Sequence, residues 1–383
     1  MLESYDPPVA SIRPTKSGTW QVRYWDPSGH QRARNFSRKT DAARFARAVE
    51  TDKLRGDWLD PNLARVTFAE WADEWLAHTS HLKPKTLYDY TRTLEVHVLP
   101  SFATARVGDI DRPTMKQFAS QLATSGAGAS TTAAALKVVR LVLGTALEAG
   151  AIKGNPAMGL RLPRPGKTEM LFLTPKQVES LAEALGEPYE TLVRFAAYTG
   201  LRAGEIGALR AGRLDLARGV VEVRESLADV NGRLIFGATK TYARRYVPLP
   251  PFLRQEMDDY MSKRAGGPEA LVFTAAQGGP LRHKNFYRRQ FKPAVQAGGL
   301  PAALRFHDLR HTYAAFCIAS TADPYAVMRR MGHSSITVTY NNYGHLLPER
   351  DAEITANLEA LRRASVDSLW TLEANSEANA GVR

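Results

Sequence analysis

A short window near the end of the chain concentrates side chains that can carry out chemistry on a phosphate ester. His307 and Arg310 are three residues apart, a spacing that places both on one face of a helix. His333 follows Gly332, and Tyr343 comes ten residues after that histidine. Arginine binds phosphate through a planar charged group, histidine transfers protons near neutral pH, and a tyrosine hydroxyl can act as an oxygen nucleophile.

An arginine also follows a turn glycine in the segment Thr199-Gly200-Leu201-Arg202. Gly200 is expected to end one helix, which puts Arg202 at the start of the next, where its side chain could bind a phosphate. Glu205 lies three residues later. It could pair with an arginine, or it could simply favour the positive end of the helix dipole.

A lysine stands at the end of a predicted strand in Thr239-Lys240-Thr241. A hairpin there could bring the Lys240 ammonium to a leaving oxygen, so we predict that Lys240 is the general acid. Arg244 and Arg245 carry the same charge nearby, but arginine holds its proton too tightly for that role.

In this order and at this spacing, the stretches resemble the tyrosine recombinase (phage-type integrase) family. Residues 199–206 resemble its first-arginine box, residues 239–249 its lysine hairpin, and residues 307–345 its C-terminal signature. The resemblance covers residues 66–363 well and the N-terminal part more loosely. It implies a site-specific recombinase that cuts DNA through a 3′-phosphotyrosyl intermediate, exchanges strands through a four-armed junction, and integrates or excises a phage or other mobile element.

The resemblance also assigns roles. It implies that Tyr343 is the nucleophile, with Tyr340 as an internal rival, and that His333 donates to the scissile phosphate. His311 is interpreted as structural or as a supporting group. No metal or cofactor is expected, since facing arginines can stabilise the charge that metal ions neutralise in many other phosphoryl-transfer enzymes. The predicted catalytic residues are Arg202, Lys240, His307, Arg310, His333 and Tyr343.

The composition is that of a basic globular protein. The chain has 383 residues, 44% of them hydrophobic, and a net charge of +12. That length predicts two or three domains, and the charge suits a nucleic acid partner, although a protein from a GC-rich genome, where arginine is simply frequent, would carry the same charge. The single cysteine, Cys317, lies in an apolar run and is expected in the core.

No apolar run is expected to reach transmembrane length, and the polar start is no signal peptide, so we expect a cytoplasmic, nucleoid-associated protein with no membrane partner.

Residues 1–62 are predicted to form a small DNA-binding module. Residues 19–25 alternate as a strand does, residues 32–37 form its partner, and Thr40 caps a following helix. Between Ser11 and Arg47, nine Lys/Arg against two Asp give a local charge of +7. The module resembles the arm-binding domain of some phage integrases; a solvated hairpin without a ligand is the alternative.

Residues 66–160 are predicted to form a four-helix core-binding domain. Thr67 and Glu70 form a capping box, the second helix starts near Pro84, Asp111 and Pro113 open the third, and Ser130 opens the fourth. A proline- and glycine-containing basic linker follows at 161–170.

Residues 171–363 are predicted to form a mixed α/β catalytic domain, followed by a flexible tail at 364–383. Thr174 caps its first helix, which buries Val178, Leu181 and Leu185, and strands are expected at 220–224, 233–238 and 245–249. The fold class is therefore mainly α with small β-sheets (α+β).

The expected partner is double-stranded DNA at core and arm sites, bound by a homotetramer. An excisionase or a host DNA-bending protein could assist. Two other functions use the same residues: a type IB topoisomerase-like enzyme that relaxes DNA without a specific site, and a DNA-binding regulator with inactive chemistry. The basic N-terminal module and the Met331-Gly332-His333-Ser334-Ser335 segment argue against the first, and the intact boxes argue against the second.

Overall fold

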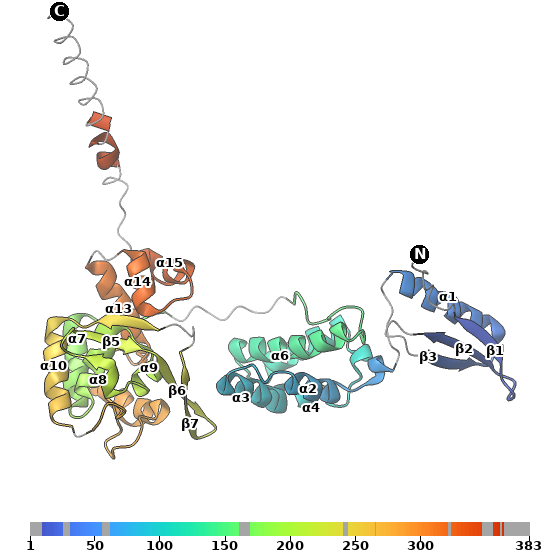
Figure 1. The fold of residues 1–383 in the computed structure, drawn as a ribbon, viewed down its shortest axis with the longest axis horizontal. Helices are drawn as coiled ribbons and strands as arrows, with labels where there is room; N and C mark the ends of the chain where they lie inside the picture. Colours follow the sequence, from blue (N-terminus) through green and yellow to red (C-terminus); the bar gives the residue numbers. More distant parts are fainter. Residues whose placement is uncertain are drawn as a thin grey trace, which may run out of the picture. The chain divides into compact units, whose positions relative to one another are not determined.

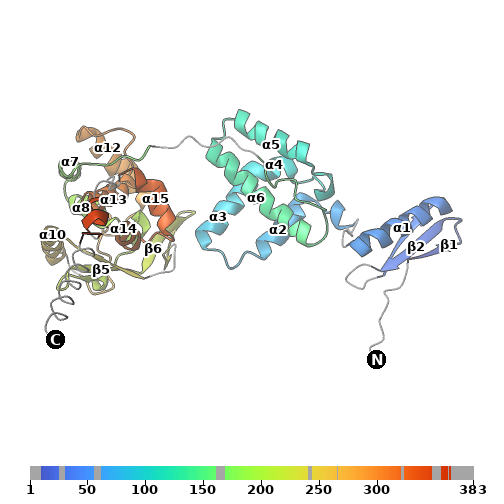
Figure 2. The same ribbon diagram turned by 90° about the horizontal axis from the view of Figure 1, so that it is seen from above.

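The computed structural model describes residues 10–25, 31–55, 62–160, 169–239, 244–264, 266–320, 323–346, 355–360 and 362–363 of the chain. The chain divides into two compact units, Met1–Thr168 and Glu169–Arg383 (Figures 1 and 2). Helices predominate and the strands form small sheets, which confirms the predicted fold class. The predicted tail and most of the predicted linker lie outside the described residues.

The N-terminal module is a sheet of three antiparallel strands packed against one helix. The strands β1 (Ser11–Pro14), β2 (Trp20–Trp25) and β3 (Gln31–Phe36) lie in that order, and α1 spans Lys39–Arg55. Alternate residues of a strand share a face, so Val22 and Tyr24 of β2 are buried together against α1. Strand β1 was not predicted. Thr40 is no cap, because the backbone N–H of Ala42 already donates to the carbonyl of Arg38 and the helix begins at Lys39.

The rest of the first unit is a bundle of helices. They are α2 (Phe68–Ala77), α3 (Pro84–Thr93), α4 (Leu99–Phe102), α5 (Arg112–Thr124) and α6 (Ala129–Glu148), with short turns η1 (Leu63–Arg65), η2 (Leu94–Val98) and η3 (Val107–Asp109). The predicted capping box at Thr67 and the Asp111 cap are confirmed. Ser130 does not open the last long helix, since α6 begins at Ala129 with Gly128 as its cap.

Helix α6 departs from the expectation about membrane length. It spans 20 residues and is apolar enough to cross a membrane by length and composition alone. In this bundle its buried residues Leu136, Val139 and Leu143 pack into the same core as Phe68 and Met115. A core helix of a bundle can pass the same length and composition test as a membrane span, because the side that it packs against its neighbours is apolar.

The second unit joins helices to two small sheets. Its helices are α7 (Pro175–Leu185), α8 (Glu190–Thr199), α9 (Ala203–Gly207), α10 (Pro251–Ser262), α11 (His283–Phe286), α12 (Lys292–Ala297), α13 (Asp308–Ala319), α14 (Pro324–Met331) and α15 (Ile336–Tyr343), with η4 (Ala211–Arg213), η5 (Tyr287–Phe291) and η6 (Gly344–Leu346). Strands β4 (Leu214–Asp215), β5 (Val220–Val223) and β8 (Arg245–Pro248) form one antiparallel sheet in the order β4-β5-β8. Strands β6 (Glu225–Val230) and β7 (Arg233–Ala238) form a hairpin. Strand β6 was missed because its side chains are half-buried with no apolar alternation.

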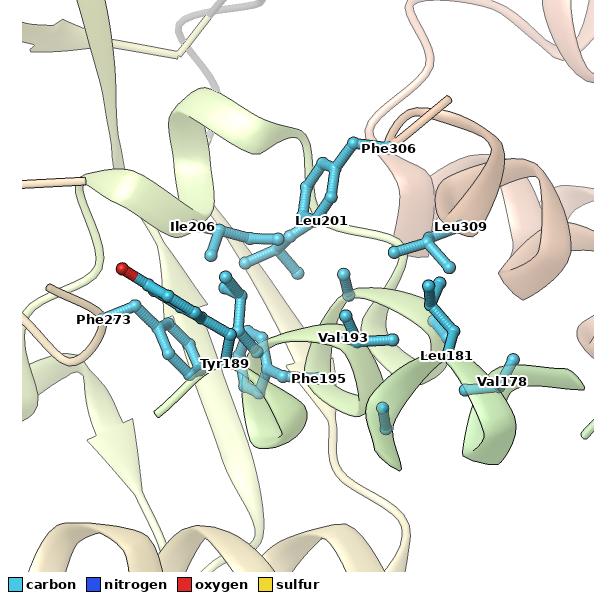
Figure 3. Packing of buried hydrophobic residues seen from close by; sticks show 14 of the residues in the cluster. Val178, Leu181, Tyr189, Val193, Phe195, Leu201, Ile206, Phe273, Phe306 and Leu309 are labelled. Atoms are coloured by element: carbon cyan, nitrogen blue, oxygen red, sulfur yellow. The ribbon is translucent and has the colours of Figure 1, made fainter. Parts of the chain in front are cut away.

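The core of the second unit holds the backbone on both sides of the predicted site residues. Leu201 and Ile206 lie on either side of Arg202 in the chain, and Phe306 and Leu309 on either side of His307; all four side chains pack into one cluster with α7 and α8 (Figure 3). Their exposed fractions are 4% or less. Because a well-packed core tolerates little displacement, these anchors fix where the intervening polar side chains emerge. The predicted cap at Thr174 and the burial of Val178 and Leu181 are confirmed, and Leu185 is partly buried.

Candidate active site

Arg202 stands at the junction of two helices. Gly200 ends α8 in the left-handed conformation with φ 64°, and Arg202 is the N-terminal cap of α9. Its Nη1 donates to Glu205 Oε1 at 3.0 Å and its Nη2 to the carbonyl of Gly332 at 3.1 Å. The guanidinium is therefore held between its own helix and the end of α14, and the prediction that it lies at a helix start is confirmed.

Glu205 connects two arginines that are distant in sequence. Arg245 donates Nη1 to Oε1 at 3.0 Å and Nη2 to Oε2 at 2.7 Å, while the backbone N–H of Arg202 donates to Oε2 at 2.9 Å. Burial alone would raise the pKa of Glu205, but these hydrogen bonds and the charges of Arg245 and Arg202 hold that pKa below its ordinary value. The carboxylate stays charged, and the prediction that Glu205 pairs with an arginine is confirmed.

Arg310 lies in the interior, 3% exposed, on α13. Its Nη1 donates to the carbonyl of Gly200 at 2.5 Å and its Nη2 to that of Met331 at 2.6 Å. Burial, followed by the charge of Arg202, lowers the pKa of Arg310 to about 9. The lowered pKa indicates that the positive charge of Arg310 is not fully balanced by the carboxylate nearby. An anion that binds there would supply the missing negative charge, so its binding is favourable.

The cluster carries an excess of positive charge. Arg202, Arg245 and Arg310 all act on Glu205, whereas the nearby carboxylate of Asp308 is engaged by Arg305. Three guanidinium groups around one carboxylate leave a surplus of two charges. An anion with several acceptor oxygens, such as a phosphodiester, matches this surplus and the forked donors of arginine.

Two of the predicted histidines lie beside these arginines. Loss of solvation, followed by the charges of His311 and Arg310, lowers the pKa of His307 to about 4. Burial, followed by the charges of Arg310 and Arg202, lowers the pKa of His333 to about 4. His333 Nδ1 lies 2.9 Å from Thr339 Oγ1. When Thr339 donates that bond, the ring proton sits on Nε2, which is then free to donate to a ligand.

Tyr343 and its rival Tyr340 differ in burial, although both lie on α15. Tyr343 is 1% exposed, whereas Tyr340 is 50% exposed. The ring of Tyr343 stacks on that of His333 with planes 11° apart, and its hydroxyl oxygen lies 2.8 Å from His311 Nδ1. Burial raises the pKa of Tyr343 to about 12, opposed by the charges of Arg310 and Arg202. Tyr343 is therefore the tyrosine that faces the arginine cluster.

The structure brings together five of the six predicted site residues. The charges of Arg202 and Arg310 both act on His307, His333 and Tyr343, which places the five in one cluster. The sixth, Lys240, lies outside the described residues. Among the described residues, no group of His, Cys, Asp and Glu could hold a metal ion.

Two residues of the cluster were undervalued from the sequence. Arg245 was set aside as a decoy, yet it shares the inward face of β8 with the buried Val247, and an inward arginine requires a carboxylate partner. His311 was interpreted as structural or as a supporting group, yet its ring lies 4.9 Å from that of His307 and its Nδ1 lies 2.8 Å from the Tyr343 oxygen. The sequence contained both signals: the alternation of Arg245 with Val247 along a strand, and the four-residue spacing of His307 and His311.

Two family models match the chain. Residues 171–350 match "Phage integrase family", and residues 67–123 match "Phage integrase, N-terminal SAM-like domain". The chain is 30% identical over 233 residues to an integrase of Mycobacterium phage FRAT1, covering 59% of this chain and 69% of that relative. It is 26% identical over 372 residues to an integrase of Mycobacterium phage D29, covering 92% of this chain and 96% of that one.

Solved structures share the fold. The Tn1549 transposon integrase in complex with transposon right end DNA aligns with a TM-score of 0.67 and 20% identity, covering 78% of this chain and 100% of that one. A lambda integrase tetramer bound to a Holliday junction aligns with a TM-score of 0.58 and 20% identity, covering 87% and 98%. At these identities the likeness establishes the architecture around the arginine cluster.

Proposed function

Because this chain belongs to the phage integrase family, we propose that the arginine cluster holds a DNA phosphodiester and that Tyr343 attacks it. The protein is a site-specific DNA recombinase of the tyrosine type, an enzyme that breaks and rejoins strands by transesterification. We further propose that it integrates and excises a phage or another mobile element.

The cleavage step joins the Tyr343 oxygen to phosphorus and releases the 5′ oxygen of the next nucleotide. Arg202 and Arg310 stabilise the charge that builds on the non-bridging oxygens, and His307 and His333 add neutral donors beside them. Lys240 supplies the proton to the leaving oxygen. The DNA then remains attached through a 3′-phosphotyrosyl bond, so the energy of the broken bond is kept for rejoining.

One observation carries this proposal: the buried guanidinium of Arg310 and the buried hydroxyl of Tyr343 lie in one cluster with a surplus of positive charge. Arg202 and Arg310 donate to the carbonyls of Gly332, Gly200 and Met331. These hydrogen bonds fix the orientation of both guanidinium planes. Each guanidinium still has further N–H groups that can donate to a phosphate. A site arranged in advance in this way loses little energy to reorganisation during reaction.

The proposed partner is double-stranded DNA. The helical bundle of the first unit and the second unit would contact its core sites, and the N-terminal module would contact its arm sites. The outer face of its sheet supports the last assignment. Arg13 pairs with Gln21, and Gln21 is bonded to both Arg23 and Asn35, so this face presents cations and amides opposite the buried face. The domain boundaries predicted at 1–62, 66–160 and 171–363 stay part of the proposal.

The proposed assembly is a homotetramer on DNA, as in the lambda integrase tetramer bound to a Holliday junction. An enzyme acting on chromosomal DNA works in the cytoplasm, and we propose association with the nucleoid. An excisionase or a host DNA-bending protein would set the direction of the reaction.

The test uses a nicked suicide substrate that carries the genomic sequences flanking the integrated element. Wild-type protein should accumulate covalent protein–DNA adduct. Arg202→Ala and Arg310→Ala should each slow adduct formation by about 10²–10³-fold while binding at low salt is nearly unchanged. Adduct formation at the wild-type rate by either variant would contradict the assignment of the phosphate ligands.

A further inference from the structure

The hydroxyl of Tyr343 has a hydrogen-bond partner outside the predicted catalytic set. His311 Nδ1 lies 2.8 Å from the Tyr343 oxygen, and the two ring centres are 5.8 Å apart. Tyr343 is 1% exposed and comes from α15, whereas His311 comes from α13. The bond therefore joins two residues that are 32 positions apart in the chain, and it does so at the oxygen proposed to react.

A buried phenol needs a proton acceptor before it can attack. Burial raises the pKa of Tyr343 to about 12, so its hydroxyl remains protonated at neutral pH. Burial also lowers the pKa of His311, with Arg305 and Arg310 acting in the same direction and Asp308 opposing them. His311 is thus neutral at that pH, and a neutral imidazole offers one nitrogen without a proton. The other groups facing His311 are His307 on its own helix and His333, which precedes α15.

We propose that His311 is a catalytic residue that accepts the Tyr343 proton at Nδ1 during strand cleavage. This rests on the proposed role of Tyr343 as the nucleophile. The O–H bond of Tyr343 breaks as the bonds from oxygen to phosphorus and from Nδ1 to hydrogen form. The bond from phosphorus to the 5′ oxygen breaks, and that oxygen takes its proton from the separate general acid. During rejoining, His311 returns its proton to Tyr343.

The other two histidines are placed for different tasks. The Nδ1 of His333 is engaged by Thr339, and its ring stacks flat on that of Tyr343. His307 meets the ring of His311 edge-on and lies one step further from the nucleophile. The charges of Arg202 and Arg310 act on both His307 and His333, and a phosphate would lie beside those two arginines. The proton acceptor and the phosphate donors are therefore different histidines.

The test separates loss of a base from loss of an acid. A suicide substrate with a 5′-bridging sulfur at the scissile phosphate has a leaving group that needs no proton, because a thiolate is a far weaker base than an alkoxide. Single-turnover adduct formation is measured on this substrate and on its oxygen counterpart across a pH series. The variants are His311→Ala and His311→Asn, and the asparagine keeps a polar atom near Nδ1 without accepting a proton. His78→Ala, at a histidine side chain 72% exposed in the other unit, is the matched control.

His311→Ala and His311→Asn should both slow adduct formation by about 10²-fold on both substrates. The defect should shrink as pH rises, since phenolate then forms without a base, while DNA binding and the His78→Ala rate match wild type. Wild-type rates for His311→Ala would overturn the inference. Wild-type rates for His311→Asn with a slow His311→Ala would also overturn it, by reducing His311 to a positioning residue. Absence of any wild-type adduct would instead overturn the proposed function.

Discussion

Arg245 and Glu205 form a two-pronged ion pair, with N–O distances of 3.0 and 2.7 Å and side-chain exposures of 9% and 1%. Arg245 also donates Nε to the carbonyl of Arg330 at 2.9 Å. A Cβ atom at Gly332 would lie 3.1 Å from its Nη1, so only a residue without a side chain fits there easily. One arginine thus joins β8, which follows the segment of Lys240, to the start of α9 and the end of α14.

Removing Arg245 should destabilise the second unit, because Glu205 would be left charged and buried. Arg245→Ala is expected to lower the free energy of unfolding by about 3–5 kcal/mol, measured by denaturant titration of the full chain. The control is Arg213→Ala, whose partner Glu222 is in the adjacent strand and whose side chain is 35% exposed. That change should cost about 1 kcal/mol or less. Equal costs for the two variants would argue against the role given to the buried pair.

Gly200 should not accept a side chain. A Cβ atom there would lie 2.3 Å from Tyr313 Cδ1, and its backbone has φ +64°. Gly299 has the same φ with nothing within 4 Å, so Gly299→Ala isolates the backbone cost of roughly 1–2 kcal/mol. Gly200→Ala should cost clearly more in thermal or denaturant unfolding. It should also slow cleavage, because the carbonyl of Gly200 holds Arg310. Indistinguishable stability of the two variants would contradict this packing.

Stability should fall as the solution becomes acidic. The pKa of His333 is about 4 in the folded protein, below its ordinary value of 6.5, so the unfolded chain binds the proton first. The contribution of neutral His333 to the free energy of unfolding is therefore present above about pH 6.5 and is lost as pH falls toward about 4. His333→Gln should remove part of the acid sensitivity, on the order of 1 kcal/mol after allowing for solvent screening. Parallel unfolding curves against pH for variant and wild type would speak against it.

The N-terminal module should carry a separable function. Removing residues 1–62 is expected to spare cleavage of a core-site suicide substrate and to impair integration between plasmids. Within the full chain, Arg23→Ala should weaken binding to arm DNA and reduce the slope of log affinity against log salt by about 1. Lys53→Ala on α1 serves as a control basic position on a different element. Unchanged integration by the truncated protein would refute the arm-binding role.

The local signals in the sequence were sufficient where one segment determines the outcome. The capping residues Thr67 and Thr174 start their helices as predicted, and Gly200 ends α8. The clustering of Arg202, Arg310 and Tyr343 was inferred from a family resemblance rather than from spacing, because these residues come from separate helices. No local pattern specifies how such helices pack.

The sequence was insufficient where a contact joins distant segments. Arg245 and Glu205 are 40 residues apart, and the partner of an inward-facing arginine cannot be identified before the sheet and helices are assembled. The bond from His311 to Tyr343 depends on the packing of α15 against α13 in the same way. The helix starts at Lys39 and Ala129 differ from prediction by one or two residues, a scale at which capping preferences compete closely.

The most direct test of the central claim is to identify the residue that becomes linked to DNA. Wild-type, Tyr343→Phe and Tyr340→Phe proteins are incubated with the suicide substrate, and the peptide bearing the nucleotide is located by mass spectrometry. We predict a 3′-phosphate ester on Tyr343, full adduct with Tyr340→Phe, and none with Tyr343→Phe despite normal DNA binding. Adduct that persists in Tyr343→Phe, or a link mapped to Tyr340, would contradict the account.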